Sequence, residues 1–452
     1  METATHIPLR ARREPWARRP RRPAVELSAA AILVAVVAIV FEPGVGLGAV
    51  LAGLVVVARG LVSGTIRTWR LAFSGGRRGW RRGRARPVRR IVSVVTAAAV
   101  LTLGLAAFSY VGAVTSPSNS SLGIRTVEWL RDNGAAGVVS FAERVYYTLT
   151  APAKGGPALR RLPQVGVAGA APGTARPTKD GHPPPALKPV IRPSLPGEGV
   201  WRATQHRFAV DRSAPVMVAT YRPDPSYPRV VAGVARIDPR RTRIALYAGL
   251  KEPPGGAGSA EVPPASRSAL LATFNSGFKH KDGGGGFFTD GRLLEPMQPG
   301  LATLVAKSGG GLDVRVWHGG TRPGPGVLFA RQNLPPIVEH GRANPRLSDG
   351  PEWGYTLGNT VLVWRSGLGV DRHGDLIYAA APDQTVRGLA RILVHAGAVR
   401  AMELDINSYW VSFNSYAKSA ARRPSKLLSG MSRPAARYLS PDDRDFFAVY
   451  AR

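Results

Sequence analysis

The stretch "TVRGLARILVHAGAVRAMELDINSYW", residues 385–410, predicts a helix, a short turn and a strand in direct succession. Glu403 and Asp405 share one face of that strand, about 7 Å apart by the rise per residue. Two carboxylates this close raise each other's pKa, so one can serve as an acid and the other as a base or nucleophile. The alternative is that both face solvent or are neutralised by arginines.

The region around this stretch, from about residue 201 to 452, is predicted to be a mixed α+β domain. Short β-rich runs alternate with Gly/Pro turns throughout it. Helix candidates are few, the clearest being 385–397 and 264–274. The predicted strands are "VMVATYRP", "RVVAGVARID", "TRIALYAGL", "LATLVAK", "LDVRVWHG", "NTVLVWRSGLGVD", "DLIYAAA" and "AMELDI".

The amino-terminal third is strongly basic and contains three long apolar runs. Lys and Arg outnumber Asp and Glu by 61 to 29 in the 452-residue chain, and the densest arginine clusters lie beside apolar runs. This layout favours juxtamembrane charge over nucleic-acid binding, for which no motif is present. The chain has no cysteine, which excludes disulfides, thiolate metal sites and a cysteine nucleophile. The apolar runs are about 25–41, 45–62 and 91–114.

We expect three membrane-spanning helices within residues 25–114. The arm 1–24 and the loop 63–90 are rich in arginine, so the positive-inside rule places both in the cytoplasm and everything after about residue 115 outside. A single broken segment in place of the first two helices, or a signal peptide at the first run, are the alternatives.

Two connecting segments are predicted between the membrane region and the domain. Residues 115–149 have helical spacing in two pieces broken at Asn133 and Gly134, which predicts a helical stalk outside the membrane. Residues 150–200 are rich in Pro and Gly, which predicts an extended tether.

Two further stretches of the domain could carry chemistry. "FNSGFKHKDGGGGFFTDGRLL", residues 274–294, places Asn275 before Gly277, followed by basic residues including His280. Its tetraglycine is more simply interpreted as a mobile surface loop, and Asp290-Gly291 predicts a hairpin turn. In 359–380, Arg365 lies beside small residues where a guanidinium could grip a phosphate. "DRHGD" at 371–375 is read as a hairpin turn, with a cation site on Asp371 and Asp375 as the alternative.

Taken together, these motifs resemble the phosphodiester glycosidase family, the relatives of the lysosomal uncovering enzyme N-acetylglucosamine phosphodiester alpha-N-acetylglucosaminidase. Bacterial members of the family are associated with exopolysaccharide. Order and spacing both fit over about residues 205–450. The motifs are "FNSGF" (274–278), "FFTDGRLL" (287–294), "WRSGLGVDRHGDLIY" (364–378), the helix 385–397 and "ELDINS" (403–408).

The resemblance implies a pocket for a sugar joined through its anomeric carbon to a phosphodiester, and hydrolysis of that bond. Asn275, Gly277, Arg365, Gly369 and Asp405 match its motifs position by position. The sequence departs from the family in having Ser276 for a glycine and "INS" at 406–408 for three glycines.

We therefore expect a membrane-anchored hydrolase of the cell envelope or of exported polysaccharide. In this hypothesis Asp405 is the acid/base or charge stabiliser, Glu403 a second carboxylate and Arg365 the phosphate ligand. The remaining substrate contacts are Asn275, Gly277, His280, Asn407 and Ser408. No cofactor is certain, although a divalent cation fits. The expected partners are a sugar phosphate or polysaccharide and membrane lipid, without nucleic acid. The rival hypothesis is a non-catalytic envelope module that binds glycan or a partner protein.

Overall fold

The computed structural model describes residues 85–157, 159–163, 184–205, 214–256, 258–354, 361–417 and 424–452. Two compact units divide the chain, the first ending at Thr96 and the second comprising Ala97–Arg452. The predicted basic arm and the first two apolar runs lie outside the described residues. The predicted loop 63–90 does so as far as residue 84.

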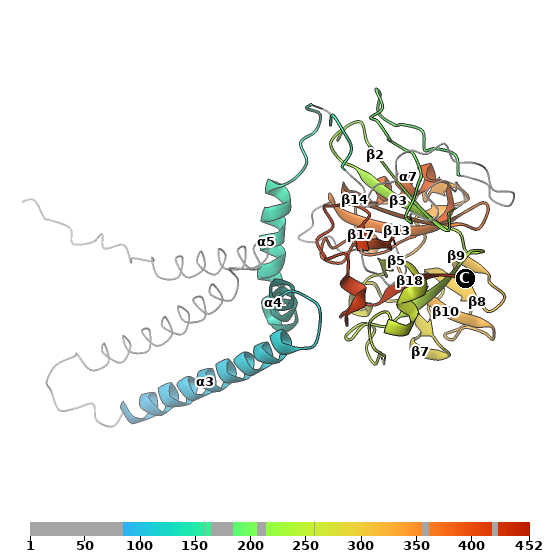
Figure 1. The fold of residues 1–452 in the computed structure, drawn as a ribbon. Helices are drawn as coiled ribbons and strands as arrows, with labels where there is room; N and C mark the ends of the chain where they lie inside the picture. Colours follow the sequence, from blue (N-terminus) through green and yellow to red (C-terminus); the bar gives the residue numbers. More distant parts are fainter. Residues whose placement is uncertain are drawn as a thin grey trace, which may run out of the picture. The chain divides into compact units, whose positions relative to one another are not determined.

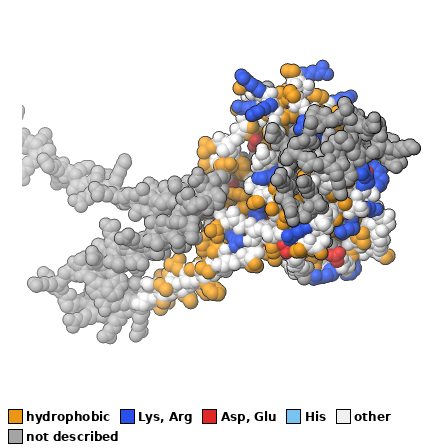
Figure 2. Space-filling model, in the orientation of Figure 1, with side chains coloured by type: hydrophobic (Ala, Val, Ile, Leu, Met, Phe, Trp, Pro, Cys, Tyr) orange, Lys and Arg blue, Asp and Glu red, His pale blue; other side chains and the backbone are white. Residues whose placement is uncertain are grey.

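The third apolar run forms the helix α3 (Ala85–Thr115), shown at the blue end of Figure 1. Its segment Ser93–Thr115 is long and apolar enough to cross a membrane, and it is the one such helix in the described part of the chain. Large apolar side chains of this helix are exposed, among them Val94 and Phe108. Figure 2 shows hydrophobic atoms gathered along it. The helix predicted over 91–114 is therefore confirmed.

The rest of the second unit is a β-rich structure of three antiparallel sheets, so the mixed α+β class with few helices is confirmed. In the eight-stranded sheet, β13 and β14 pair through the turn at Asp371–Asp375, as predicted. The strands are β1 (Arg202–Ala203), β2 (Val216–Tyr221), β3 (Ala232–Ile237), β4 (Thr242–Tyr247), β5 (Leu270–Asn275), β6 (Phe287–Thr289), β7 (Arg292–Glu295), β8 (Ala302–Lys307), β9 (Leu312–Val316), β10 (Val327–Gln332), β11 (Val338–Glu339), β12 (Arg342–Ala343), β13 (Val363–Asp371), β14 (Leu376–Gln384), β15 (Ala398–Glu403), β16 (Phe413–Tyr416), β17 (Pro424–Lys426) and β18 (Phe446–Ala451). The strand orders are β1-β2-β3-β14-β13-β15-β11-β12, β7-β6-β10-β8-β9 and β17-β16-β5-β18-β4.

Burial on both faces explains why the central strands are almost continuously apolar. One face of the eight-stranded sheet packs against the two smaller sheets in the main core, which includes Phe274, Tyr378 and Phe447. The other face packs against the helix α7 (Val386–His395). The strands β13 and β14 therefore have α7 on one side and the strands β5 and β18 on the other (Figure 1). Because Thr385 caps α7 through the amide of Gly388, the helix begins where the sequence predicted.

The predicted helix over 264–274 is wrong. Residues Pro264–Ala269 form a single 3-10 segment, and the apolar residues that follow form β5. This strand lies in the middle of its sheet between β16 and β18, and its side chains enter core clusters on both faces, so all six residues are buried. A fully buried strand loses the alternation that would distinguish it from a helix.

The predicted stalk and tether pack on the domain in the structure. The stalk consists of α4 (Leu122–Leu130) and α5 (Ala136–Leu149), broken at Asn133 and Gly134 as predicted. Of the predicted tether, residues 184–200 lie against the eight-stranded sheet. Buried Glu198 pairs there with Arg222 at 2.9 Å, so this part is not a free linker.

Candidate active site

The predicted motifs meet where β5 and β15 end and β13 begins. Asn275 closes β5, Arg365 and Ser366 lie early in β13, and Glu403 closes β15. The backbone of Ser366 accepts from the amide of Leu404 at 2.8 Å and donates to the carbonyl of Asp405 at 3.0 Å. Residues distant in the sequence are thus joined around one buried point.

Asn275 occupies that point with its side chain fully hydrogen-bonded inside the protein. Its amide nitrogen donates to the Ser366 hydroxyl at 3.0 Å and to the Ser276 carbonyl at 2.8 Å. Its Oδ1 accepts from the Tyr378 hydroxyl at 2.9 Å and from the Ser412 amide at 3.0 Å. Asn275 therefore links β5 to β13 and β14 and has no further bond to give to a ligand.

Arg365 lies on the opposite face of β13 from Ser366, since successive side chains of a strand alternate. Its Nη1 donates to Glu403 Oε1 at 2.6 Å and its Nε to the Gln384 carbonyl at 2.9 Å. Both partners of this ion pair are buried. Burial outweighs the attraction of Arg365 and raises the pKa of Glu403 to about 7 from an ordinary 4.5.

Asp405 has a different partner, Arg444, which the sequence reasoning did not single out. Arg444 Nη2 donates to Asp405 Oδ2 at 2.9 Å and to the Gly277 carbonyl at 2.9 Å. Asp405 Oδ1 accepts from the Asn407 amide at 2.9 Å. Burial raises the pKa of Asp405 despite the nearby Arg444 guanidinium. This arrangement brings two predicted motifs, at Gly277 and Asp405, onto one guanidinium.

Gly277 has a steric reason to be glycine. A Cβ at this position would lie 2.9 Å from Asn333 Oδ1, which itself accepts from the Phe278 amide at 3.2 Å. The Asn333 amide nitrogen also donates to the carbonyl of Leu404 at 3.1 Å. Close approach of the two loops at Asn333 thus requires the missing side chain.

The hypothesis that Glu403 and Asp405 form one carboxylate pair on a strand face differs from the observed geometry. The strand β15 ends at Glu403, and Asp405 lies in the loop beyond it. Each carboxylate is neutralised by its own arginine, Arg365 for Glu403 and Arg444 for Asp405. The structure thus agrees with the alternative interpretation, in which arginines pair with both carboxyl groups.

The three remaining predicted residues, Asn407, Ser408 and His280, have different surroundings. Asn407 is buried, and its Oδ1 accepts from the Tyr409 amide at 2.9 Å. Ser408 is half-buried and shares a hydrogen bond of 3.3 Å with the Tyr147 hydroxyl. The ring of His280 lies 3.2 Å from Glu295 and away from the Asp405 group. His280 is thus the predicted residue least connected to the others.

The helices α4 and α5 cover this region. Glu128 of α4 forms an ion pair with Lys279, and Asp132 pairs with Lys281 at 2.6 Å. The Tyr147 hydroxyl of α5 reaches the loop that carries Asp405 through the contact at Ser408. Asp405 itself is only 3% exposed.

Buried polar atoms without a hydrogen-bond partner gather around the same point among the described residues. They are the Ser276 hydroxyl, Arg444 Nε and Asp445 Oδ1, on residues linked by the bonds of Arg444 to the Gly277 carbonyl and of the Ser276 amide to the Asp445 carbonyl. Glu403 Oε2 is also unpaired, beside Arg365. Buried polar groups are nearly always paired, so a cluster of unpaired ones marks a place suited to a polar ligand. Within the described ranges, no group of three or more His, Asp and Glu side chains is placed to hold a metal ion.

Comparison with known proteins gives a distant likeness of fold and no family. No family model matches the chain, and neither does any curated protein. One similar solved structure is the catalytic domain of zebrafish N-acetylglucosamine-1-phosphodiester alpha-N-acetylglucosaminidase, auto-inhibited by its pro-peptide. It is 17% identical at a TM-score of 0.37, over 54% of this chain and 85% of that one.

Two further structures show a similar distant likeness. A hypothetical protein from Synechocystis is 13% identical at a TM-score of 0.35, over 54% of this chain and 63% of its own. A putative exported protein from Burkholderia pseudomallei is 11% identical at a TM-score of 0.29. The match covers 50% of this chain and 75% of that protein. The likeness to these three structures is one of fold alone.

Sequence reasoning missed the arginine that binds Asp405. Arg444 lies in "PDDRD", residues 441–445, where alternating charge precedes a buried strand. In the structure, Asp442 pairs with Arg437 at 2.7 Å and Asp445 with Arg331 at 2.7 Å. Dense opposite charge next to an apolar run is the signal that would have indicated a buried ion network.

Proposed function

We propose that the chain is a membrane-anchored hydrolase that cleaves a glycosyl-phosphodiester bond in the cell envelope or in exported polysaccharide. The observation that carries the proposal is the buried Asp405–Arg444 pair, surrounded by unpaired polar atoms and joined to the Gly277 loop. The motif resemblance, position by position, supports the substrate class.

The proposed reaction adds water to the anomeric carbon of the sugar. The bond between that carbon and the phosphate oxygen breaks, and the phosphate leaves as a monoester while the proton of the attacking water is taken up by a base. Asp405 provides that base or, as a carboxylate, stabilises the positive charge that develops on the sugar ring. Its raised pKa brings it closer to neutral operating pH.

Arg444 and Lys279 are the cations best placed to hold the phosphate. Arg444 already binds Asp405 and the loop carbonyl, and its Nε has no partner within the described residues. Lys279 is bound by Glu128 of the covering helix, a carboxylate that a phosphate can replace. In this arrangement Arg365 and Glu403 support the strand that leads to Asp405.

A test measures sugar release by the full-length chain, purified in detergent micelles, from a panel of hexosyl 1-phosphate methyl esters. We expect Asp405→Asn to lower the rate by about 10²–10⁴-fold, the usual contribution of general acid–base catalysis. The matched control is Asp313→Asn, which removes an exposed carboxylate paired with Arg400 on the surface. Equal rates for wild type and Asp405→Asn would remove Asp405 from the mechanism.

Access to the site must be controlled in the same experiment. Sugar release is therefore also measured for Glu128→Gln alone and for Glu128→Gln combined with Asp405→Asn. The Glu128→Gln substitution weakens the contact of α4 with Lys279. If neither the wild type nor the Glu128→Gln protein releases sugar from any ester, the hydrolase proposal fails.

A non-catalytic envelope module that binds glycan or a partner protein is the second candidate. It is favoured by the complete internal bonding of Asn275 and by the closed Arg365–Glu403 pair. Saturable binding of an ester without sugar release, in the uncovered Glu128→Gln protein, would support this candidate over the enzyme.

A further inference from the structure

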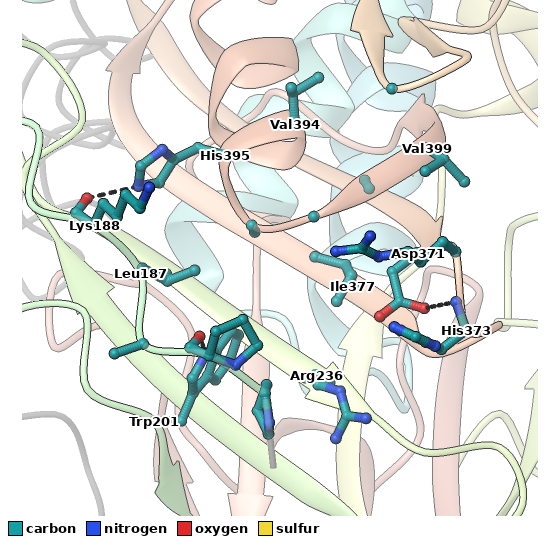
Figure 3. A pocket seen from close by; sticks show the side chains of 18 of the residues that line it. Leu187, Lys188, Trp201, Arg236, Asp371, His373, Ile377, Val394, His395 and Val399 are labelled. Carbon is teal, nitrogen blue, oxygen red and sulfur yellow. Dashed lines mark hydrogen bonds between the residues drawn. The ribbon is translucent and has the colours of Figure 1, made fainter. Parts of the chain in front are cut away.

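A cavity lies beside the eight-stranded sheet, at the turn between β13 and β14. It has a volume of about 690 Å³, within the range of small-molecule sites. Figure 3 shows it between the segment that carries Leu187 and Trp201, the end of α7 at His395, and the β13–β14 turn at His373. None of the predicted catalytic residues lines it.

One wall of this cavity is apolar and rigidly held. The Trp201 indole donates to the Pro185 carbonyl at 3.0 Å, which fixes the ring against the wall. Leu187, Ile377 and Val394 complete the apolar surface. A flat aromatic ring beside aliphatic side chains suits the face of a ring compound.

The other wall is cationic. Lys188, Arg236, Arg240 and Arg372 line it, against Asp371 as the one carboxylate among the lining residues. Two of these arginines, buried Arg236 and exposed Arg240, are neutralised by carboxylates: Asp375 pairs with both, and Asp238 pairs with Arg240.

Lys188 and Arg372 have no carboxylate partner among the residues that the structure describes. Both lie at the exposed rim with His373. The ring of His395 is held by a contact of 2.8 Å with the Lys188 carbonyl, which ties α7 to the 184–200 segment. The rim therefore carries an uncompensated positive charge next to an apolar ring wall.

The composition of the lining narrows the ligand further. It contains no Asn, Gln, Ser or Thr, the side chains that supply paired donors and acceptors to a nucleobase edge. What it supplies is a ring platform, a guanidinium and an ammonium for an acid group, and Asp371 for hydroxyls. The Asp371 carboxylate is oriented by the amides of His373 at 2.8 Å and Asp375 at 2.9 Å.

We propose that this cavity binds a saccharide carrying an acid group, a phosphate or a carboxylate, with the sugar ring against Trp201 and the acid group at Arg372 on the exposed rim. The assignment does not require catalysis at Asp405 and stands if that proposal fails.

The test is calorimetric titration of the full-length chain in detergent micelles. The probes are α-D-glucose 1-phosphate, D-glucuronate and neutral D-glucose, with adenosine 5′-phosphate as the nucleotide comparison. We expect at least one anionic sugar to bind, and about tenfold weaker binding in Arg372→Ala, since charge-assisted contacts dominate such sites. The glucose 1-phosphate and glucuronate arms distinguish phosphate from carboxylate.

Trp201→Ala and Arg292→Ala complete the design. We expect Trp201→Ala to weaken binding of both anionic sugars, whereas Arg292→Ala removes an exposed arginine on β7 outside the cavity and should change nothing. Because Arg372 is exposed, its variant stays informative if Trp201→Ala fails to fold. Unchanged binding in Arg372→Ala, equal affinity for neutral glucose, tighter binding of the nucleotide, or no binding of either anionic sugar would each overturn the proposal.

Discussion

Replacing Glu403 by glutamine tests the electrostatics at the heart of the candidate site. Glu403 is fully buried, and Arg365 Nη1 donates to one of its oxygens at 2.6 Å. The other oxygen has no partner in the described part of the chain. Burial favours the neutral acid and the guanidinium favours the carboxylate, and burial is the stronger influence.

The sign and size of the expected effect follow from the pKa values. The folded protein holds a proton on Glu403 up to about pH 7, whereas an ordinary glutamate releases it near 4.5. Folded protein binds more protons than unfolded chain between these values, so the stability contributed by this group is complete below pH 4.5 and is lost as pH rises to 7. The loss amounts to about 3 kcal/mol, at 1.36 kcal/mol per pH unit.

Glutamine does not titrate, so Glu403→Gln should lack this loss. We expect the free energy of unfolding of the variant, relative to wild type, to rise by about 2.5 kcal/mol between pH 5 and pH 8. Urea unfolding of the full-length chain in detergent, followed by tryptophan fluorescence at each pH, measures the difference. Glu339→Gln, on the partly exposed strand β11, is the control and should show none.

A relative stability that falls as pH rises would refute this reasoning. It would mean that Arg365 holds Glu403 as a carboxylate and lowers its pKa, in which case removing the charge leaves the buried guanidinium unpaired, at a cost of about 3–5 kcal/mol.

Three further changes test the fold around the site. Glu128→Gln should loosen α4 from Lys279 and speed sugar release about fivefold, the equivalent of about 1 kcal/mol, and an unchanged rate would show that α4 does not limit access. Tyr378→Phe removes the hydroxyl that donates to Asn275 and should lower the free energy of unfolding by about 1–2 kcal/mol in urea titrations; no change would mean that this bond is dispensable. Gly369→Ala would place a Cβ 2.6 Å from a backbone oxygen of β15 and should destabilise by about 1–3 kcal/mol, seen as a lower thermal midpoint; an unaltered midpoint would contradict the close packing.

Local patterns predicted most of the elements in the domain. The helix α7 and the strand β15 follow from apolar periodicity and a Thr385 cap, and the Asp290-Gly291 turn follows from its residues, both at positive φ. The strand β5 was misread because both of its faces are buried in cores and because the strands that pair with it, β16 and β18, come more than a hundred residues later in the chain.

The candidate site was predicted in position but not in its bonding. Gly277 and Asp405 do lie together, yet what joins them is Arg444, whose place depends on the path of the carboxy-terminal strand. Asn275 was expected to face a ligand, and the partners that occupy it, such as Tyr378, come from strands whose register no local pattern reveals. Side-chain partners depend on tertiary packing, which a single sequence encodes only indirectly.

Burial of the ion pairs at the candidate site also determines how these pairs respond to salt concentration. The Arg437–Asp442 and Arg444–Asp405 pairs are almost inaccessible, so dissolved ions cannot enter between their charges. The Arg400–Asp313 pair is 46% and 40% exposed and will be screened. The two buried pairs are therefore expected to persist at high salt concentration, whereas the Arg400–Asp313 pair is expected to weaken as salt rises.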